Sequence, residues 1–152
     1  MRTTYHTVAD LDPQDRTLLE AAVTATHQAY APYSHFYVGA AVRTTAGTIY
    51  AGGNQENASY PLCLCAERVA IAAAHASSPG VPIAAIAVTA RNPAKSLQDP
   101  IPPCGACRQV IRELELRFEQ PVRVIFSSET GRVQVCEGVA ELLPFSFGPR
   151  FL

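Results

Sequence analysis

The sequence predicts an α/β domain of three layers, with helices on both faces of a mixed central sheet of about five strands. Helical and strand patterns follow one another in the order helix–β–β–helix–β–helix–β–β–helix, which is typical of this architecture. Residues 83–90 form a continuous apolar run of strand length, as expected of a central strand covered on both faces. Residues 66–75 are mostly Ala, Val and Ile, so we expect that helix to be buried.

The first helix and the hairpin after it are marked by their ends. Asp12 is a good helix cap and Pro13 suits the first helical position, while Pro32 predicts that the helix stops near Tyr30. The two strands of the hairpin are predicted over 37–43 and 48–51, with Gly52 and Gly53 ending the second.

The rest of the chain continues the alternation after an irregular polar stretch. Residues 54–62 are too irregular for a regular element, and 91–103 are predicted to form a loop that contains prolines. Further elements are expected as a helix over 104–118, strands over 122–126 and 133–136, and a short helix over 139–143.

Length and composition restrict the class of protein. The 152 residues suit a single domain spanning 1–152, and the net charge of −1 without a Lys/Arg cluster argues against a nucleic-acid partner. The N-terminus lacks a signal-peptide pattern, and no apolar run reaches the length needed to span a membrane. We therefore expect a cytoplasmic protein whose five cysteines are metal ligands or free thiols rather than disulfides.

Cysteines at two predicted helix starts form the strongest chemical pattern. Cys104 and Cys107 have the C-x-x-C spacing that lets two sulfurs bind one metal ion, and Cys65 precedes the other helix. Helix N-termini favour the thiolate form. Three protein ligands with one open position are typical of a catalytic zinc ion that activates a water molecule, and we expect one Zn²⁺ per chain.

Glu67 follows the first of these cysteines by two residues. A glutamate in the first turn of a helix commonly compensates the helix dipole at the surface. Here the apolar neighbours indicate a buried helix, in which a carboxylate needs a partner such as metal-bound water. Glu67 is therefore the candidate proton shuttle.

Two other interpretations of the cysteines compete with a metal site. A lone C-x-x-C can be a redox pair, but Pro103 and the distant Cys65-Ala66-Glu67 make that interpretation poorer. Cys63 and Cys136 are expected to be buried small apolar side chains rather than ligands.

These residues resemble a known family, the zinc-dependent nucleoside deaminases and within it the small homotetrameric cytidine deaminases. Cys65-Ala66-Glu67 and Pro103-Cys104-Gly105-Ala106-Cys107 carry the metal motif. Residues 33–41, 54–61 and 142–147 resemble its base-pocket, ribose-binding and C-terminal segments, and the match covers about 12–148. The chain departs from the family at Cys63 and in a longer loop over 92–102.

The resemblance implies roles residue by residue. Cys65, Cys104 and Cys107 would bind zinc, Glu67 would shuttle the proton, Phe36 would pack on the pyrimidine, and the Ala66 backbone would contact the base. Asn54 and Glu56 would hold the ribose hydroxyls. The remaining substrate-binding positions implied are Gln55, Asn57, Ala58, Ser59 and Tyr60. Tyr60 and Phe147 would lie at subunit boundaries.

The implied reaction is deamination of cytidine and deoxycytidine to uridine and deoxyuridine, with release of ammonia, as in pyrimidine salvage. Because three thiolates and Zn²⁺ carry a net charge of −1, we expect Arg68 to offset that charge by a hydrogen bond to a ligand sulfur. Three alternatives remain. The first is a deaminase for another substrate, such as blasticidin S; the second is a structural zinc module that binds a partner; the third is an enzyme that edits bases in a polynucleotide.

Overall fold

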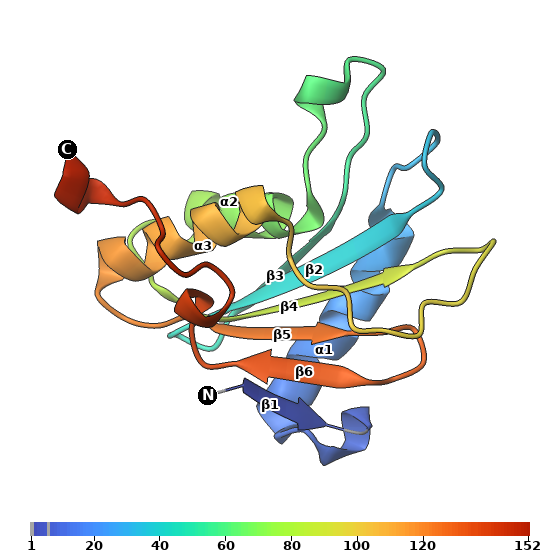
Figure 1. Cartoon of the computed structure of the whole chain (residues 1–152), viewed down its shortest axis with the longest axis horizontal. Coiled ribbons are helices and arrows are strands. Elements are labelled where there is room, and N and C mark those ends of the chain that lie inside the picture. Colours follow the sequence, from blue (N-terminus) through green and yellow to red (C-terminus); the bar gives the residue numbers. More distant parts are fainter. Residues whose placement is uncertain (1, 6) are drawn as a thin grey trace.

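The computed structural model describes residues 2–5 and 7–152, and within them the chain forms one six-stranded sheet (Figure 1). Its strand order is β1-β6-β5-β4-β2-β3. The strands are β1 (Arg2–Tyr5), β2 (Tyr37–Thr44), β3 (Ile49–Gly53), β4 (Ile83–Arg91), β5 (Arg123–Ser127) and β6 (Val133–Cys136). The pair β4 and β5 is parallel and the other described pairs are antiparallel, so the sheet is mixed, as predicted.

Helices cover both faces of this sheet. On one face, α1 (Pro13–Ala25) packs Leu18, Leu19 and Ala22 against alternate residues of the central strands. On the other, α2 (Ala66–Ser77) and α3 (Gly105–Phe118) pack against the opposite set of residues of the same strands. The two sets alternate along β4 because successive side chains of a strand point to opposite faces. The predicted three-layer α/β fold is therefore confirmed.

The sheet extends one strand further than the pattern indicated. β1 pairs antiparallel with β6, with Thr3 opposite Val135, and forms an edge of the sheet. Four residues are too few to produce a clear alternation of apolar and polar side chains, which explains why this strand was not predicted.

The prediction that Gly52 and Gly53 end the second hairpin strand was wrong. β3 continues through both, and Gly53 pairs with Gly39 of β2. A Cβ atom on Gly39 would lie 2.0 Å from the Ala22 carbonyl oxygen, and one on Gly53 would lie 2.5 Å from the Ala29 nitrogen. Gly39 and Gly53 therefore allow close backbone packing on the α1 side of the sheet, whereas a Cβ on Gly52 would lie 2.6 Å from the Val69 side chain of α2; neither Gly52 nor Gly53 is there to stop the strand.

Element ends differ from the prediction at two other places. α1 stops at Ala25 and a 3-10 turn over Thr26–Gln28 follows, so that Tyr30 is free to form a β-bridge with Gln55. The short helix expected over 139–143 is a 3-10 turn, Val139–Glu141. In the described part of the chain, every helix is too short or too polar to cross a membrane.

The topology places the starts of α2 and α3 together. α3 connects the parallel strands β4 and β5, so its first turn lies at the edge of the sheet where β4 ends. Segment 54–64, called the protruding segment below, leads from β3 to α2 and rises from the body of the molecule (Figure 1). It contains a 3-10 turn, Tyr60–Leu62, and is otherwise irregular, as expected.

Candidate metal centre and substrate pocket

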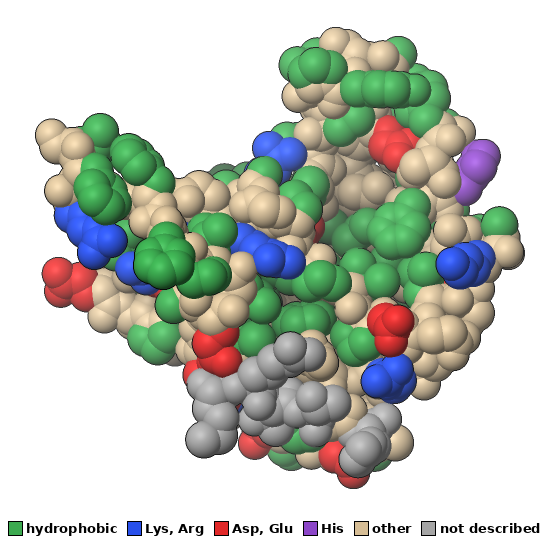
Figure 2. Space-filling model, in the orientation of Figure 1, with side chains coloured by type: hydrophobic (Ala, Val, Ile, Leu, Met, Phe, Trp, Pro, Cys, Tyr) green, Lys and Arg blue, Asp and Glu red, His purple; other side chains and the backbone are tan. Residues whose placement is uncertain are grey.

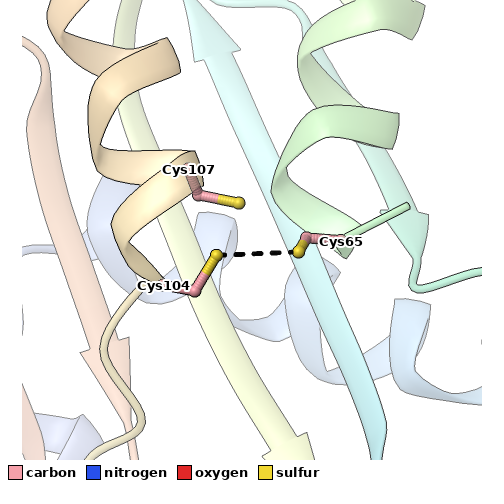
Figure 3. Close-up of side chains that lie close together, drawn as sticks. All are labelled: Cys65, Cys104 and Cys107. Atoms are coloured by element: carbon pink, nitrogen blue, oxygen red, sulfur yellow. Dashed lines mark hydrogen bonds between the residues drawn. The ribbon is translucent and has the colours of Figure 1, made fainter. Parts of the chain in front are cut away.

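Three thiols meet between the first turns of α2 and α3. Cys65 is the residue that caps α2, Cys104 caps α3, and Cys107 lies in the first turn of α3. Their sulfurs lie within 4.8 Å of one another, with 3.7 Å between the Sγ atoms of Cys65 and Cys104. Figure 3 shows the three side chains pointing toward a common centre. We call them the thiol cluster.

The spacing of the thiol cluster fits zinc. Four ligands placed tetrahedrally at the usual Zn–S distance of about 2.3 Å lie about 3.8 Å apart. The 3.7 Å between the Cys65 and Cys104 sulfurs agrees with that value, and all three sulfurs lie within 4.8 Å of one another. Cys63 lies outside the cluster, and its sulfur accepts a hydrogen bond from the Asn57 backbone N–H at 3.2 Å. Cys136 is buried as expected, but the same expectation was wrong for Cys63, which is only partly buried. Three protein ligands leave the fourth position open for water.

The electrostatics of the thiol cluster favour negative charge. Hydrogen bonds from Cys107 and Cys104, together with the Arg68 guanidinium, lower the pKa of Cys65 to about 5. The hydrogen bond that Cys107 makes to the Cys65 sulfur raises the pKa of Cys107, and a negative charge on Cys65 further opposes ionisation of this second thiol. The group of thiols therefore holds at least one charge at neutral pH, and a bound cation would allow the others to ionise.

Arg68 lies where the sequence placed it, next to a ligand sulfur. Its Nη2 atom donates to the Cys63 carbonyl oxygen at 3.0 Å and toward the Cys65 sulfur at 3.9 Å. The first bond holds the guanidinium against the turn that precedes α2, and the second directs positive charge at the cluster.

Glu67 is buried beside the thiol cluster, with 3% of its surface exposed. Burial raises the pKa of Glu67 above its ordinary value, and the nearby Cys65 sulfur adds to the rise. The carboxylate lines the same cavity as Cys65 and Cys104. A buried carboxyl group with a raised pKa, facing a cavity beside the thiol cluster, has the properties of a proton shuttle.

The cavity beside the thiol cluster has a volume of about 260 Å³, and it is called the pocket below. Polar and apolar side chains both line it, together with two cysteines of the thiol cluster. The lining residues are Phe36, Val38, Asn54, Gln55, Glu56, Cys63, Leu64, Cys65, Glu67, Val88, Ile101, Pro102 and Cys104. Its small size suits one nucleoside rather than a polymer.

Asn54 and Glu56 both reach the pocket, but neither is free of partners. The Asn54 side chain accepts from the Val38 N–H at 2.9 Å and donates to the Phe36 carbonyl at 3.0 Å. One N–H and one lone pair of its amide remain for a ligand. The bonds to β2 fix the amide in position beside Phe36.

Glu56 is held by the loop that precedes β2. Its carboxylate accepts from the backbone N–H groups of Tyr33 and Ser34, at 2.9 and 3.3 Å, and from the Ser34 hydroxyl. The Ser34 hydroxyl bond is the largest cause of the lowered pKa of Glu56, so this carboxylate is ionised at neutral pH. The sequence did not single out Ser34, although its position two residues before Phe36 is that of a polar turn residue, and its Oγ accepts from the Phe36 N–H.

The protruding segment carries the other predicted residues. Gln55 lines the pocket, and its backbone exchanges two hydrogen bonds with Leu64, each 2.9 Å long. Ala66 is buried at the start of α2. The structure places the remaining four outside the lining of the pocket, exposed on the segment: Asn57, Ala58, Ser59 and Tyr60.

Ile101, Pro102 and Val88 were missed as parts of the pocket. Val88 belongs to the apolar run of β4, where the sequence indicates burial but not which residue faces a cavity. Ile101 and Pro102 directly precede the second cysteine motif, and their closeness in sequence to Cys104 could have indicated that they line the pocket.

The thiol cluster has the geometry of a zinc site: three protein ligands leave the fourth position open, and a buried carboxylate lies beside it. Comparison with known proteins agrees. The model of the cytidine and deoxycytidylate deaminase zinc-binding region matches residues 12–120. This chain belongs to the cytidine and deoxycytidylate deaminase family.

Individual relatives span nearly the whole chain. A cytidine deaminase of Halalkalibacterium halodurans is 42% identical over 130 residues, which cover 86% of this chain and 91% of that protein. One from Mycobacterium tuberculosis is 36% identical, covering 84% of each. The crystal structure of cytidine deaminase from Burkholderia pseudomallei is 46% identical, covers 86% of this chain and 97% of that one, and superposes with a TM-score of 0.75.

Proposed function

We propose that this chain catalyses the hydrolytic deamination of cytidine and deoxycytidine, with uridine or deoxyuridine and ammonia as products, in pyrimidine salvage. The observation that carries the proposal is the buried Glu67 carboxylate, which shares one small pocket with the thiol cluster. The relatives named cytidine deaminase support the choice of substrate.

One Zn²⁺ per chain, held by Cys65, Cys104 and Cys107, would supply the Lewis acidity that makes water a nucleophile near neutral pH. Its support is the sulfur spacing and the match to a zinc-binding region. Arg68 offsets part of the negative charge of the thiolates.

Glu67 moves the proton in this proposal. Its carboxylate takes one proton from the attacking water and delivers it to N3 of the pyrimidine. The second proton comes from the hydroxyl group added to C4 and passes through the same carboxylate to the amino group; the C4–N bond breaks, ammonia leaves, and C4 becomes the carbonyl carbon of the uracil ring. Burial of Glu67 keeps bulk water away from this exchange and brings its pKa closer to the working pH.

The other pocket residues orient the nucleoside. Phe36 packs on the pyrimidine, while Asn54 and Glu56 bind the ribose hydroxyls; all three line the pocket. The backbone of Ala66, between Cys65 and Glu67 at the start of α2, contacts the base. The remaining substrate contacts that we propose come from the protruding segment, namely Gln55, Asn57, Ala58, Ser59 and Tyr60.

The active form that we propose is a cytoplasmic homotetramer of chains that each fold as a single deaminase domain. The support for assembly is the exposure of large apolar side chains near the pocket and at the C-terminus, among them Tyr60 at 69%, Phe145 at 104% and Phe147 at 57%. Figure 2 shows such side chains on two projections of the surface, with a hollow between them. Tyr60 and Phe147 would lie at the boundaries between subunits.

An ultraviolet assay tests the function directly. The purified chain is incubated with cytidine, deoxycytidine and blasticidin S, and loss of the amino group is followed by absorbance and by release of ammonia. We expect turnover of the two nucleosides. Glu67→Gln should keep its fold and zinc but lose about 10³-fold or more in kcat, because an amide cannot carry the proton. Turnover of blasticidin S alone, or normal activity of the variant, would contradict the proposal.

A further inference from the structure

The loop over residues 92–102, called the rim loop, is firmly attached to the turn between β5 and β6. The Glu129 N–H donates to the Leu97 carbonyl at 3.1 Å, and the Glu129 carboxylate accepts from the Leu97 N–H at 3.1 Å. The Ile101 N–H donates to the Ser127 carbonyl, also at 3.1 Å. These bonds hold in place the end of the rim loop, which directly precedes Cys104 of the thiol cluster in the sequence.

Ile101 and Pro102 form an apolar wall of the pocket. Val88, which is 1% exposed, lies in the same lining. The groups that can hydrogen-bond a ligand come from other elements: Asn54 and Glu56 from the protruding segment and Glu67 from α2. Where Ile101 and Pro102 line it, the pocket therefore offers a ligand no polar side chain.

A cytosine ring also has a polar and an apolar edge. O2, N3 and the amino group on C4 follow one another along one edge, and C5–H and C6–H form the other. If C4 lies at the thiol cluster and N3 faces Glu67, C5 lies on the side of C4 away from N3. Glu67 belongs to α2, so that side is the side of Cys104 and of the residues that precede it.

We propose that Ile101, supported by Pro102, determines the space available at C5 of the pyrimidine and so selects among cytosine nucleosides by the size of their 5-substituent. This inference rests on the proposed function and adds a specificity-determining residue to it. The rim loop holds Ile101 rigidly, so the wall cannot retreat from a larger substituent as an unattached loop would. Unsubstituted cytidine fits, and 5-methyl- and 5-iodocytidine are disfavoured in order of size.

The test compares kcat/KM for cytidine, 5-methylcytidine and 5-iodocytidine in the parent chain, Ile101→Val and Ile101→Ala. We expect the efficiency with 5-methylcytidine relative to cytidine to rise about tenfold in Ile101→Ala, since fitting one methyl group in a hydrophobic pocket is worth about that factor. Ile101→Val should give a smaller rise, and the effect should be larger for the iodo compound. Unchanged ratios in folded variants that contain zinc would overturn the proposal.

A binding measurement separates this inference from the proposed function. Calorimetry with uridine and 5-methyluridine reports on the wall without turnover, and Ile101→Ala should improve binding of the methylated compound alone. Asp99→Asn is the matched control, because Asp99 lies in the rim loop but pairs with Arg132 at the surface, with 87% of its side chain exposed. It should leave every ratio unchanged. Lack of cytidine turnover by the parent would reject the function, whereas equal binding changes for both uridines would reject the role of Ile101.

Discussion

The thiol cluster lies on the first turns of α2 and α3, whereas the opposite part of the pocket comes from the protruding segment 54–64. Glu67 and Cys107, on the helix side, are 3% and 0% exposed. Tyr60 and Leu62, on the protruding segment, are 69% and 64% exposed. A single chain therefore completes the part of the site that performs the chemistry, but leaves much of the segment that would bind the sugar without a protein covering. The difference implies that chemistry and assembly can be impaired separately.

The largest effect should come from the helix side. Cys104→Ala removes one of three ligands, and we expect the zinc content to fall from about one per chain to near zero, with loss of measurable deamination. Metal analysis of the purified variant checks this. Cys63→Ala is the matched control, since its sulfur bonds the Asn57 backbone rather than the cluster, and it should keep its zinc. Full zinc retention by Cys104→Ala would exclude the ligand assignment.

A smaller effect on the same side should follow from Arg68→Gln. Loss of the cation beside the Cys65 sulfur leaves the thiolates less compensated, and we expect kcat and zinc affinity each to fall about 10–100-fold. The cytidine KM should change much less, because Arg68 is not among the residues that line the pocket. Stopped-flow or steady-state rates and competition with a zinc chelator measure the two quantities.

Two further variants control that experiment. Arg68→Lys keeps the charge but replaces the guanidinium, whose Nη2 atom bonds both the Cys63 carbonyl and the Cys65 sulfur, with a shorter and more strongly hydrated group, so its losses should be intermediate. Arg117→Gln, at the far end of α3 against Phe118, should behave as the parent. A loss confined to KM would show that Arg68 contacts substrate instead.

The smallest expected effect concerns assembly. Phe147→Ala truncates an exposed aromatic side chain at the proposed subunit boundary, and we expect dissociation at protein concentrations about tenfold higher than for the parent. Light scattering over a dilution series measures it, with zinc content as the internal control, because the thiol cluster is complete within one chain. An active monomer at all concentrations, for parent and variant alike, would refute the tetramer.

Much of the helix side could be predicted from the sequence because its signals are local. Cys65 and Glu67 are two residues apart, Cys104 and Cys107 three apart, and the apolar character of residues 66–75 indicates that the carboxylate is buried. The structure places all four together, and the family comparison agrees with the fold and the reaction class.

The rest of the pocket depends on contacts between distant residues. Ser34 holds Glu56 across 22 positions of sequence, and the Ile101 backbone is fixed by Ser127. Hydrogen bonds between residues so far apart leave no periodic pattern in the sequence. The glycines at the end of β3 misled for the same reason, because what requires them is the approach of another segment, not a local turn.

The glycine at position 39 has a consequence for how this protein tolerates mutation. It is the residue next to Val38, whose N–H and C=O hold the side chain and backbone of Asn54. Any larger residue at Gly39 must push α1 away from β2 or push β2 toward the pocket, since its Cβ would meet the Ala22 carbonyl. A change on the face of the sheet opposite the thiol cluster would thus be transmitted through one peptide unit to Asn54 and its side of the pocket. Replacements at Gly39 should therefore lower the stability of the fold and disturb the Asn54 side of the pocket together, although the residue faces α1 on the other side of the sheet.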